Sequence, residues 1–164
     1  MDCRQITFCS QKSKINPLQL QSLFNDGAFW ARERQVEDLE QMLAHSHAIA
    51  TCWDGEFLIG FARALSDGIY RATIWDVVIH PDYQGLGLGR KLVETLLSHA
   101  LISRVERVYL MTTYQQGFYQ QIGFQENQST TMVLLNSAEL QPISLQSLNS
   151  EVQETVKEPF PLNV

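Results

Sequence analysis

The sequence predicts an α/β fold in which helices flank a mixed β-sheet. Segments of strand length carry alternating or β-branched apolar residues, and other segments repeat apolar residues at helical spacing. One stretch passes from a strand through a glycine-rich loop directly into a helix, and another strand follows. Such a unit is a right-handed crossover with a parallel strand pair. The 164 residues suit one domain, and 45% hydrophobic content is enough for a sizeable core.

The first half of the chain is expected to contribute a strand at 5–9, helices at 17–27 and 36–45, and strands at 48–53 and 56–64. Apolar residues alternate in the first strand. Asn16 and Pro17 are residue types favoured at the N-cap and first position of a helix, and Gly27 is a typical C-cap. An apolar stripe marks the second helix. Asp54-Gly55 is typical of a type I′ turn, so it predicts a hairpin between the two strands.

The second half is expected to contribute strands at 72–80, 107–112 and 132–135 and helices at 87–102 and 115–121. A β-branched apolar run ends at His80-Pro81, which predicts a long central strand. Leucines then recur at helical spacing from Leu88 to Leu101. Val108 and Leu110 indicate the next strand, and Gly123 is expected to stop the short helix before it. The last strand is expected to close the sheet.

Charge and cysteine usage exclude several classes of protein. A net charge of −6 and a pI of about 5.1 disfavour nucleic-acid binding. No apolar run approaches the roughly 20 residues of a membrane span, and the N-terminus lacks a signal-peptide layout. Three cysteines without CxxC spacing indicate reduced thiols, so we expect a cytoplasmic protein. His45 and His47 have no third ligand nearby in sequence, so no metal is expected.

The loop from Gln84 to Lys91 is the most informative part of the chain. Its three alternating glycines allow backbone amides to surround an anion, and a helix N-terminus follows with unpaired donors and partial positive charge. A Walker A loop would need Lys where Arg90 stands. A dinucleotide fingerprint would need the third glycine one residue later than Gly89.

Two motifs resemble the GCN5-related N-acetyltransferase (GNAT) family. Gln84-x-x-Gly87-x-Gly89 after a strand is similar to the family's acyl-coenzyme A pyrophosphate loop, and Phe118-Tyr119 followed by Gly123-Phe124 is similar to its F-Y-x-x-x-G-F signature. The resemblance covers about residues 4–136. It implies six to seven strands with about four helices, a GNAT domain at 1–136, and an extension at 137–164 that is partly ordered or a docking helix.

The resemblance also implies acetyl-CoA as acyl donor and a set of residues that bind it. They are Val78, Ile79, Gln84, Gly85, Leu86, Gly87, Leu88, Gly89, Arg90, Lys91, Thr112 and Tyr119. The family often has Asn at the position of Thr112, whose hydroxyl can replace one hydrogen bond of an amide but not both.

Acyl transfer to an amine needs an acid for the departing thiolate and a neutral amine. By the resemblance, Tyr119 is the general acid, with Tyr114 as a second candidate and a purely packing role for Tyr119 as the alternative. Asp76 is the candidate base because a carboxylate in an apolar strand is costly unless paired or used. The alternative is that Asp76 pairs with Arg63 or Arg71. His80 is a weaker candidate base.

The segment around Phe29-Trp30 is expected to contact the acceptor, or else to pack beneath the second helix. Residues 26–40 carry five acidic and two basic side chains, which would attract an amine cation. We therefore expect transfer of acetyl from acetyl-CoA to a primary amine by direct attack in a ternary complex.

The residues Trp75 to Val78 and Tyr83 to Gly89 resemble a plastid and cyanobacterial branch that includes serotonin N-acetyltransferases, which suggests an arylalkylamine acceptor. A protein lysine or N-terminal acetyltransferase is the alternative enzyme, and a non-catalytic coenzyme A sensor or interaction module is the alternative from another class. The expected partner is a small-molecule or peptide amine, with no nucleic acid or membrane, and the chain is expected to be a monomer or homodimer.

Overall fold

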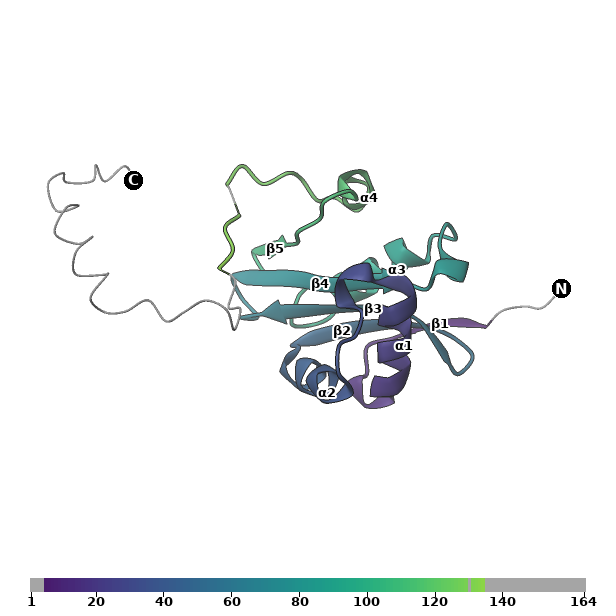
Figure 1. Ribbon diagram of the computed structural model, residues 1–164. Coiled ribbons are helices and arrows are strands. Elements are labelled where there is room, and N and C mark those ends of the chain that lie inside the picture. Colours follow the sequence, from purple (N-terminus) through teal and green to yellow (C-terminus); the bar gives the residue numbers. More distant parts are fainter. Residues whose placement is uncertain (1–4, 130, 135–164) are drawn as a thin grey trace, which may run out of the picture. The chain divides into compact units, whose positions relative to one another are not determined.

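The computed structural model describes residues 5–129 and 131–134 of the chain, which divides into one unit ending at Glu126 and another beginning at Asn127. Within the described residues the strands are β1 (Ile6–Cys9), β2 (Ala48–Asp54), β3 (Phe57–Ser66), β4 (Arg71–Ile79) and β5 (Arg107–Tyr109). The α-helices are α1 (Pro17–Gly27), α2 (Val36–His45), α3 (Leu88–Leu97) and α4 (Gln116–Gln120) (Figure 1). Short 3-10 helices are η1 (Lys12–Lys14), η2 (Phe29–Ala31) and η3 (Pro81–Tyr83).

The strands form a mixed sheet in the order β1-β2-β3-β4-β5. Each pair from β1 to β4 is antiparallel, and β4 pairs with β5 in parallel. The connection from β4 to β5 runs through α3, so the expected crossover unit is present. The α/β class with a mixed sheet is confirmed, with five strands in the described part where six to seven were expected.

Helices cover both faces of this sheet. Leu20 and Phe24 of α1 and Leu39 of α2 are buried in one apolar cluster. On the other face, Leu92 and Leu96 of α3 are fully buried in a second cluster, against which α4 packs. Burying both faces explains why β2 and β3 read as nearly continuous apolar runs.

The expected strand at 132–135 is wrong over the residues that are described. Met132, Val133 and Leu134 have no strand structure and are 91%, 80% and 82% exposed. An apolar sequence alone does not make a strand, because strand structure depends on pairing with a neighbour. Leu135 and the proposed extension at 137–164 lie outside the described residues, and the boundary after residue 136 stays a prediction.

Helix α3 and strand β5 end earlier than expected. Helix α3 stops at Leu97. After Ser98 the amides of His99 and Ile102 bond to carbonyls three residues earlier instead of four, and the chain turns. Gly27 is the last residue of α1, where a C-cap was expected. Its lack of a side chain serves packing, because a Cβ there would lie 2.8 Å from Cγ2 of Val78.

A β-bulge interrupts β4 at Asp76. Phe61 pairs with Val78 and Arg63 pairs with Trp75, so two residues of β4 lie opposite one residue of β3. Asp76 adopts φ +52°, the left-handed region that non-glycine residues rarely occupy. Strict alternation along an unbulged strand would put Ile74, Asp76 and Val78 on one face. The bulge breaks that alternation: Ile74 packs in the cluster beneath α3, whereas Val78 packs in the cluster beneath α1 and α2.

Candidate active site

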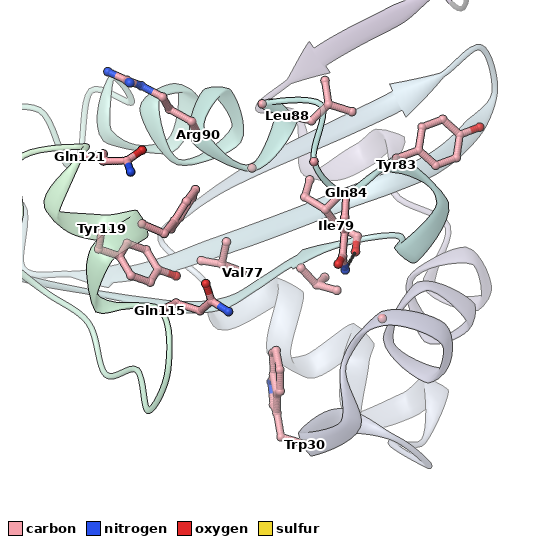
Figure 2. A pocket seen from close by; sticks show the side chains of 16 residues that line it. Trp30, Val77, Ile79, Tyr83, Gln84, Leu88, Arg90, Gln115, Tyr119 and Gln121 are labelled. Atoms are coloured by element: carbon pink, nitrogen blue, oxygen red, sulfur yellow. Dashed lines mark hydrogen bonds between the residues drawn. The ribbon is translucent and has the colours of Figure 1, made fainter.

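A cavity of about 570 Å³ lies where β4 ends and the glycine loop begins (Figure 2). Strand β4 pairs with β5 only from Arg71 to Thr73, so the two strands pair before the bulge and not after it. The end of β4 forms one wall, the loop and the start of α3 form another, and α4 forms a third. The cavity therefore follows from the bulge and from the short parallel pairing.

Most residues that were expected to bind the donor line this cavity. They are Val78, Ile79, Gln84, Gly85, Gly87, Leu88, Gly89, Arg90 and Tyr119, together with Trp30 from the expected acceptor segment. Leu86, Lys91, Thr112, Asp76 and Phe29 are not among the lining residues. The structure thus brings the glycine loop and the tyrosine motif together, although about 30 residues separate them in sequence.

The glycine loop presents a row of unpaired amides at the N-terminus of α3. Gly85 and Gly87 have φ +77° and +76°, and Gly87 is the N-cap of the helix. The amides of residues 85–90 have no acceptor anywhere in the described part of the chain, while that of Lys91 bonds to the carbonyl of Gly87. Unpaired amides in this arrangement, with the helix dipole behind them, have the chemistry to bind an anion.

Of the two charged side chains at the start of α3, only that of Arg90 lies at the cavity. Arg90 lines the cavity, and its Nε lies 2.8 Å from Glu94 one turn later. Nζ of Lys91 lies 5.0 Å from the ring centroid of Phe8 on β1, which is a cation–π contact away from the cavity. Gln84 donates its side-chain amide to the carbonyl of Ile79 and so fixes the start of the loop against the end of β4.

Tyr119 lies on α4 and reaches the cavity from the wall facing β4 (Figure 2). Its ring packs edge-on against Phe118 and Phe124, and among the described residues no hydrogen bond of its hydroxyl is found. Burial raises the pKa of Tyr119 above its ordinary value near 10. Tyr114 is 82% exposed and lies outside the cavity lining, which favours Tyr119 as the acid.

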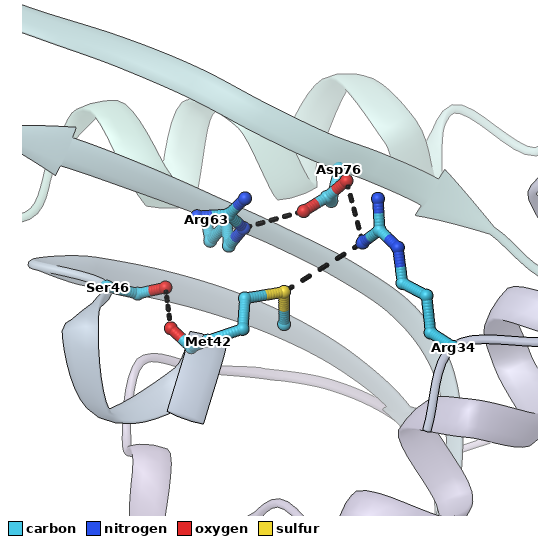
Figure 3. Close-up of polar contacts among 5 residues, drawn as sticks. All are labelled: Arg34, Met42, Ser46, Arg63 and Asp76. Carbon is cyan, nitrogen blue, oxygen red and sulfur yellow. Dashed lines mark hydrogen bonds and ion pairs between the residues drawn. The ribbon is translucent and has the colours of Figure 1, made fainter. Parts of the chain in front are cut away.

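Asp76 is held by two guanidinium groups. Nε of Arg63 lies 2.6 Å from one carboxylate oxygen, and Nη1 of Arg34 lies 3.2 Å from the other (Figure 3). Arg71 pairs with Glu106 instead. Because both oxygens of Asp76 accept from cations and its side chain is only 4% exposed, the geometry favours the ion-pair alternative over a role as base.

The remaining candidates lie at the edge of the site. The hydroxyl of Thr112 accepts a hydrogen bond from the amide of Gln115, the residue just before α4. This bond ties Thr112 to the start of the helix. His80 accepts from the amide of Asp82 and is not among the lining residues. Phe29 and Trp30 stack edge-on, with exposures of 73% and 51%. The ring of Trp30 reaches the cavity from below β4 (Figure 2).

Sequence reasoning missed six lining residues: Gly27, Val77, Tyr83, Gln115, Phe118 and Gln121. Phe118 and Gln121 are in or beside the tyrosine motif, and Gln115 is one helical turn before Tyr119, so helical spacing could have found Gln115. Val77 reaches the cavity because the bulge turns its side chain, and no local sequence signal indicates the bulge.

A profile of the Acetyltransferase (GNAT) family matches residues 17–124, which include the loop and the tyrosine helix. The chain belongs to the GNAT acetyltransferase family. It is an acetyltransferase, as its relatives are. It is 35% identical to the uncharacterized N-acetyltransferase ycf52 of Porphyra purpurea over 122 residues, which cover 71% of this chain and 69% of that protein.

A second relative and a solved structure extend the comparison. This acetyltransferase is 38% identical to the chloroplastic serotonin N-acetyltransferase 2 of Oryza sativa over 97 residues, covering 56% of this chain and 48% of that protein. A GNAT-family acetyltransferase from Streptococcus pneumoniae superposes with a TM-score of 0.68 at 27% identity, covering 80% of this chain and 98% of that one.

Three further observations concern the location of this acetyltransferase and its capacity to bind a metal. The cytoplasmic location stays a prediction, because the Oryza sativa relative is named a chloroplastic protein. Among the described residues, no helix is long and apolar enough to cross a membrane. The same residues contain no group of three or more His, Cys, Asp or Glu side chains that could hold a metal ion.

Proposed function

We propose that this acetyltransferase transfers the acetyl group of acetyl-CoA to a primary amine by direct attack in a ternary complex. One observation carries the proposal: the loop with unpaired amides at residues 85–90 lines the same cavity as Tyr119. The loop has the chemistry to hold a diphosphate, and the tyrosine has the chemistry to protonate a leaving thiolate.

The donor would lie along the end of β4 with its diphosphate on the loop. The amides of Gly85 to Arg90 would hold the phosphate oxygens, and Arg90 can add a charged contact. Past Thr73, β4 has no β5 partner, so the main chain of Val77 to Ile79 can pair with the amide groups of the pantetheine arm. Acetyl-CoA supplies the thioester that reacts.

Tyr119 would act as the general acid. The amine nitrogen attacks the thioester carbonyl, the carbon–nitrogen bond forms, and the carbon–sulfur bond breaks. The departing thiolate takes the phenolic proton of Tyr119. The nitrogen loses one proton to solvent as the amide forms, and solvent returns a proton to Tyr119. Because burial raises the pKa of Tyr119, its hydroxyl stays protonated at neutral pH and remains available to donate.

The amine must be neutral when it attacks. An alkylamine with a pKa near 10.4 is about 1 part in 2,500 neutral at pH 7, which is a deficit of roughly 4.6 kcal/mol. Asp76 was the expected base, but its two ion pairs leave no free oxygen in this structure. We therefore propose that the proton leaves to solvent, and that the rate rises with pH as more of the amine becomes neutral.

The acceptor would enter past Trp30. An aromatic ring at this wall suits a ring-bearing amine such as serotonin, and the acidic excess of residues 26–40 attracts its cation. The exposure of Phe29 and Trp30 also leaves room for a lysine side chain or a peptide N-terminus, so a protein acetyltransferase is the second candidate.

A panel of amines tests the proposal. Release of free thiol from acetyl-CoA would be followed with arylalkylamines, polyamines, amino acids and lysine peptides. Faster release with an arylalkylamine than with lysine peptides would support the small-molecule reading, and the reverse order would support the protein acetyltransferase. Binding of acetyl-CoA without release by any amine would favour a non-catalytic module.

A further inference from the structure

We propose that Arg34 is a positioning residue that joins the acceptor-side loop to the bulged strand and so sets where Trp30 stands. This inference rests on the proposed function, because it deepens the account of the acceptor wall. It begins with the loop between α1 and α2, where η2 carries Trp30 and Arg34 follows four residues later.

The guanidinium of Arg34 contacts three separate elements. Nη1 lies 3.2 Å from the carboxylate of Asp76 on β4 and 3.9 Å from Sδ of Met42 on α2 (Figure 3). The guanidinium carbon lies 5.3 Å from the ring centroid of Phe24 on α1. Arg34 is two-thirds buried, with a side-chain exposure of 33%, which is uncommon for a loop arginine.

The backbone of the loop is anchored as well. The carbonyl of Arg34 accepts from the side chain of Gln21, and the amide of Glu33 bonds to the side chain of Asn25. Glu33 adopts φ +65°, so the chain turns sharply just before Arg34. Both hydrogen bonds join the loop to α1, and the contact between Arg34 and Asp76 joins it to the sheet.

The far end of the contact is the bulge itself. Asp76 adopts a left-handed conformation and is held by Arg63 from the neighbouring strand. The next three residues of β4, Val77 to Ile79, line the cavity. Arg34 therefore connects the strand that carries one wall of the cavity to the loop that carries Trp30, and loss of the contact should release the loop without emptying the phosphate site.

Arg32 provides a matched control. It lies in the same loop, carries the same charge and is exposed, and no contact of its side chain is found among the described residues. Arg34→Met and Arg32→Met each remove one positive charge near the acceptor, but only the first removes the contact with Asp76. Arg34→Lys restores the charge without the planar group and should recover part of the effect.

Kinetics form the first arm of the test. Arg34→Met should raise the KM for the preferred amine of the panel at least about fivefold while the Kd for acetyl-CoA stays within about twofold, and Arg32→Met should change neither beyond about twofold. Equal effects of the two variants, or equal changes in both constants for Arg34→Met, would overturn the proposal.

Fluorescence forms the second arm and needs no acceptor. In a Trp75→Phe background, Trp30 is half exposed and Trp53 is 9% exposed, so acrylamide quenching reports mainly on Trp30. Arg34→Met should raise the quenching constant by at least about 1.5-fold, and Arg32→Met should leave it unchanged. An unchanged constant in Arg34→Met overturns the proposal whatever the kinetics. Absence of acetyl-CoA binding in the wild type would instead overturn the proposed function.

Discussion

Gly27 of α1 lies against Val78 of β4 so closely that a Cβ on Gly27 would meet Cγ2 of Val78 at 2.8 Å and the carbonyl of Ile79 at 3.3 Å. Gly27→Ala should therefore destabilise the protein by about 1–3 kcal/mol through overpacking. Gly117→Ala on α4 is the control, because a Cβ there meets nothing within 4 Å. Urea unfolding measures both, and equal stability of the two variants would contradict the close packing.

Gly87→Asp should abolish the stabilisation of the protein by acetyl-CoA. The substitution adds a negative charge at the N-cap of α3, beside the unpaired amides. Gly68→Asp is the matched control, since Gly68 has φ +79°, equally open surroundings and a place in a turn that does not line the cavity. Melting temperatures with and without acetyl-CoA report the result. A retained shift in Gly87→Asp would mean that the diphosphate lies elsewhere.

Tyr119→Phe should lower turnover at least about tenfold with unchanged affinity for acetyl-CoA, because only the proton donor is lost. Tyr114→Phe removes a hydroxyl from the exposed residue five positions earlier and should leave turnover as it is. Single-turnover thiol release and calorimetric binding separate the two effects. Full activity of Tyr119→Phe would remove Tyr119 from the chemistry.

The pH dependence should show the same acid. Burial raises the pKa of Tyr119, so the folded protein holds this proton more tightly than the unfolded chain does. Its contribution to stability is complete below the ordinary value of about 10 and is lost as the pH rises through the folded value. We expect kcat/KM to rise with pH while the amine loses its proton, and kcat to fall only above about pH 10. A fall beginning near neutrality would point to another acid.

No described cysteine should form an acyl-enzyme. Burial raises the pKa of the Cys52 thiol to about 11, and its side chain is fully buried under α3. Cys52→Ala and Cys9→Ala should keep turnover within about twofold of the wild type. Iodoacetamide at pH 8 should leave Cys52 unmodified in the folded protein, as mass spectrometry would show. Loss of turnover in either variant without loss of folding would favour a covalent route.

Local sequence signals were enough to predict much of the fold and part of the site. Gly85 and Gly87 need positive φ, and glycine supplies it, so the loop could be read directly. Asp76 also has positive φ, but an aspartate within a β-branched run gives no sign of it. Its partner Arg34 is 42 residues away, and pairing over that distance depends on how α1 and α2 pack on the sheet. The direction of the Asp76 side chain therefore could not be predicted from the sequence.

The N–H donors of residues 85–90 are main-chain groups and are not supplied by any side chain. Replacing Leu86 or Leu88 changes the apolar surface of the loop, but only a substitution by proline removes a backbone N–H donor. Substitution of the exposed Leu86 should therefore cost little stability, whereas Leu88 packs against the cluster beneath α3 and the positive φ of Gly85 and Gly87 has to be kept. A scan of every substitution through this segment should find a tolerant position at Leu86 between two intolerant ones at Gly85 and Gly87.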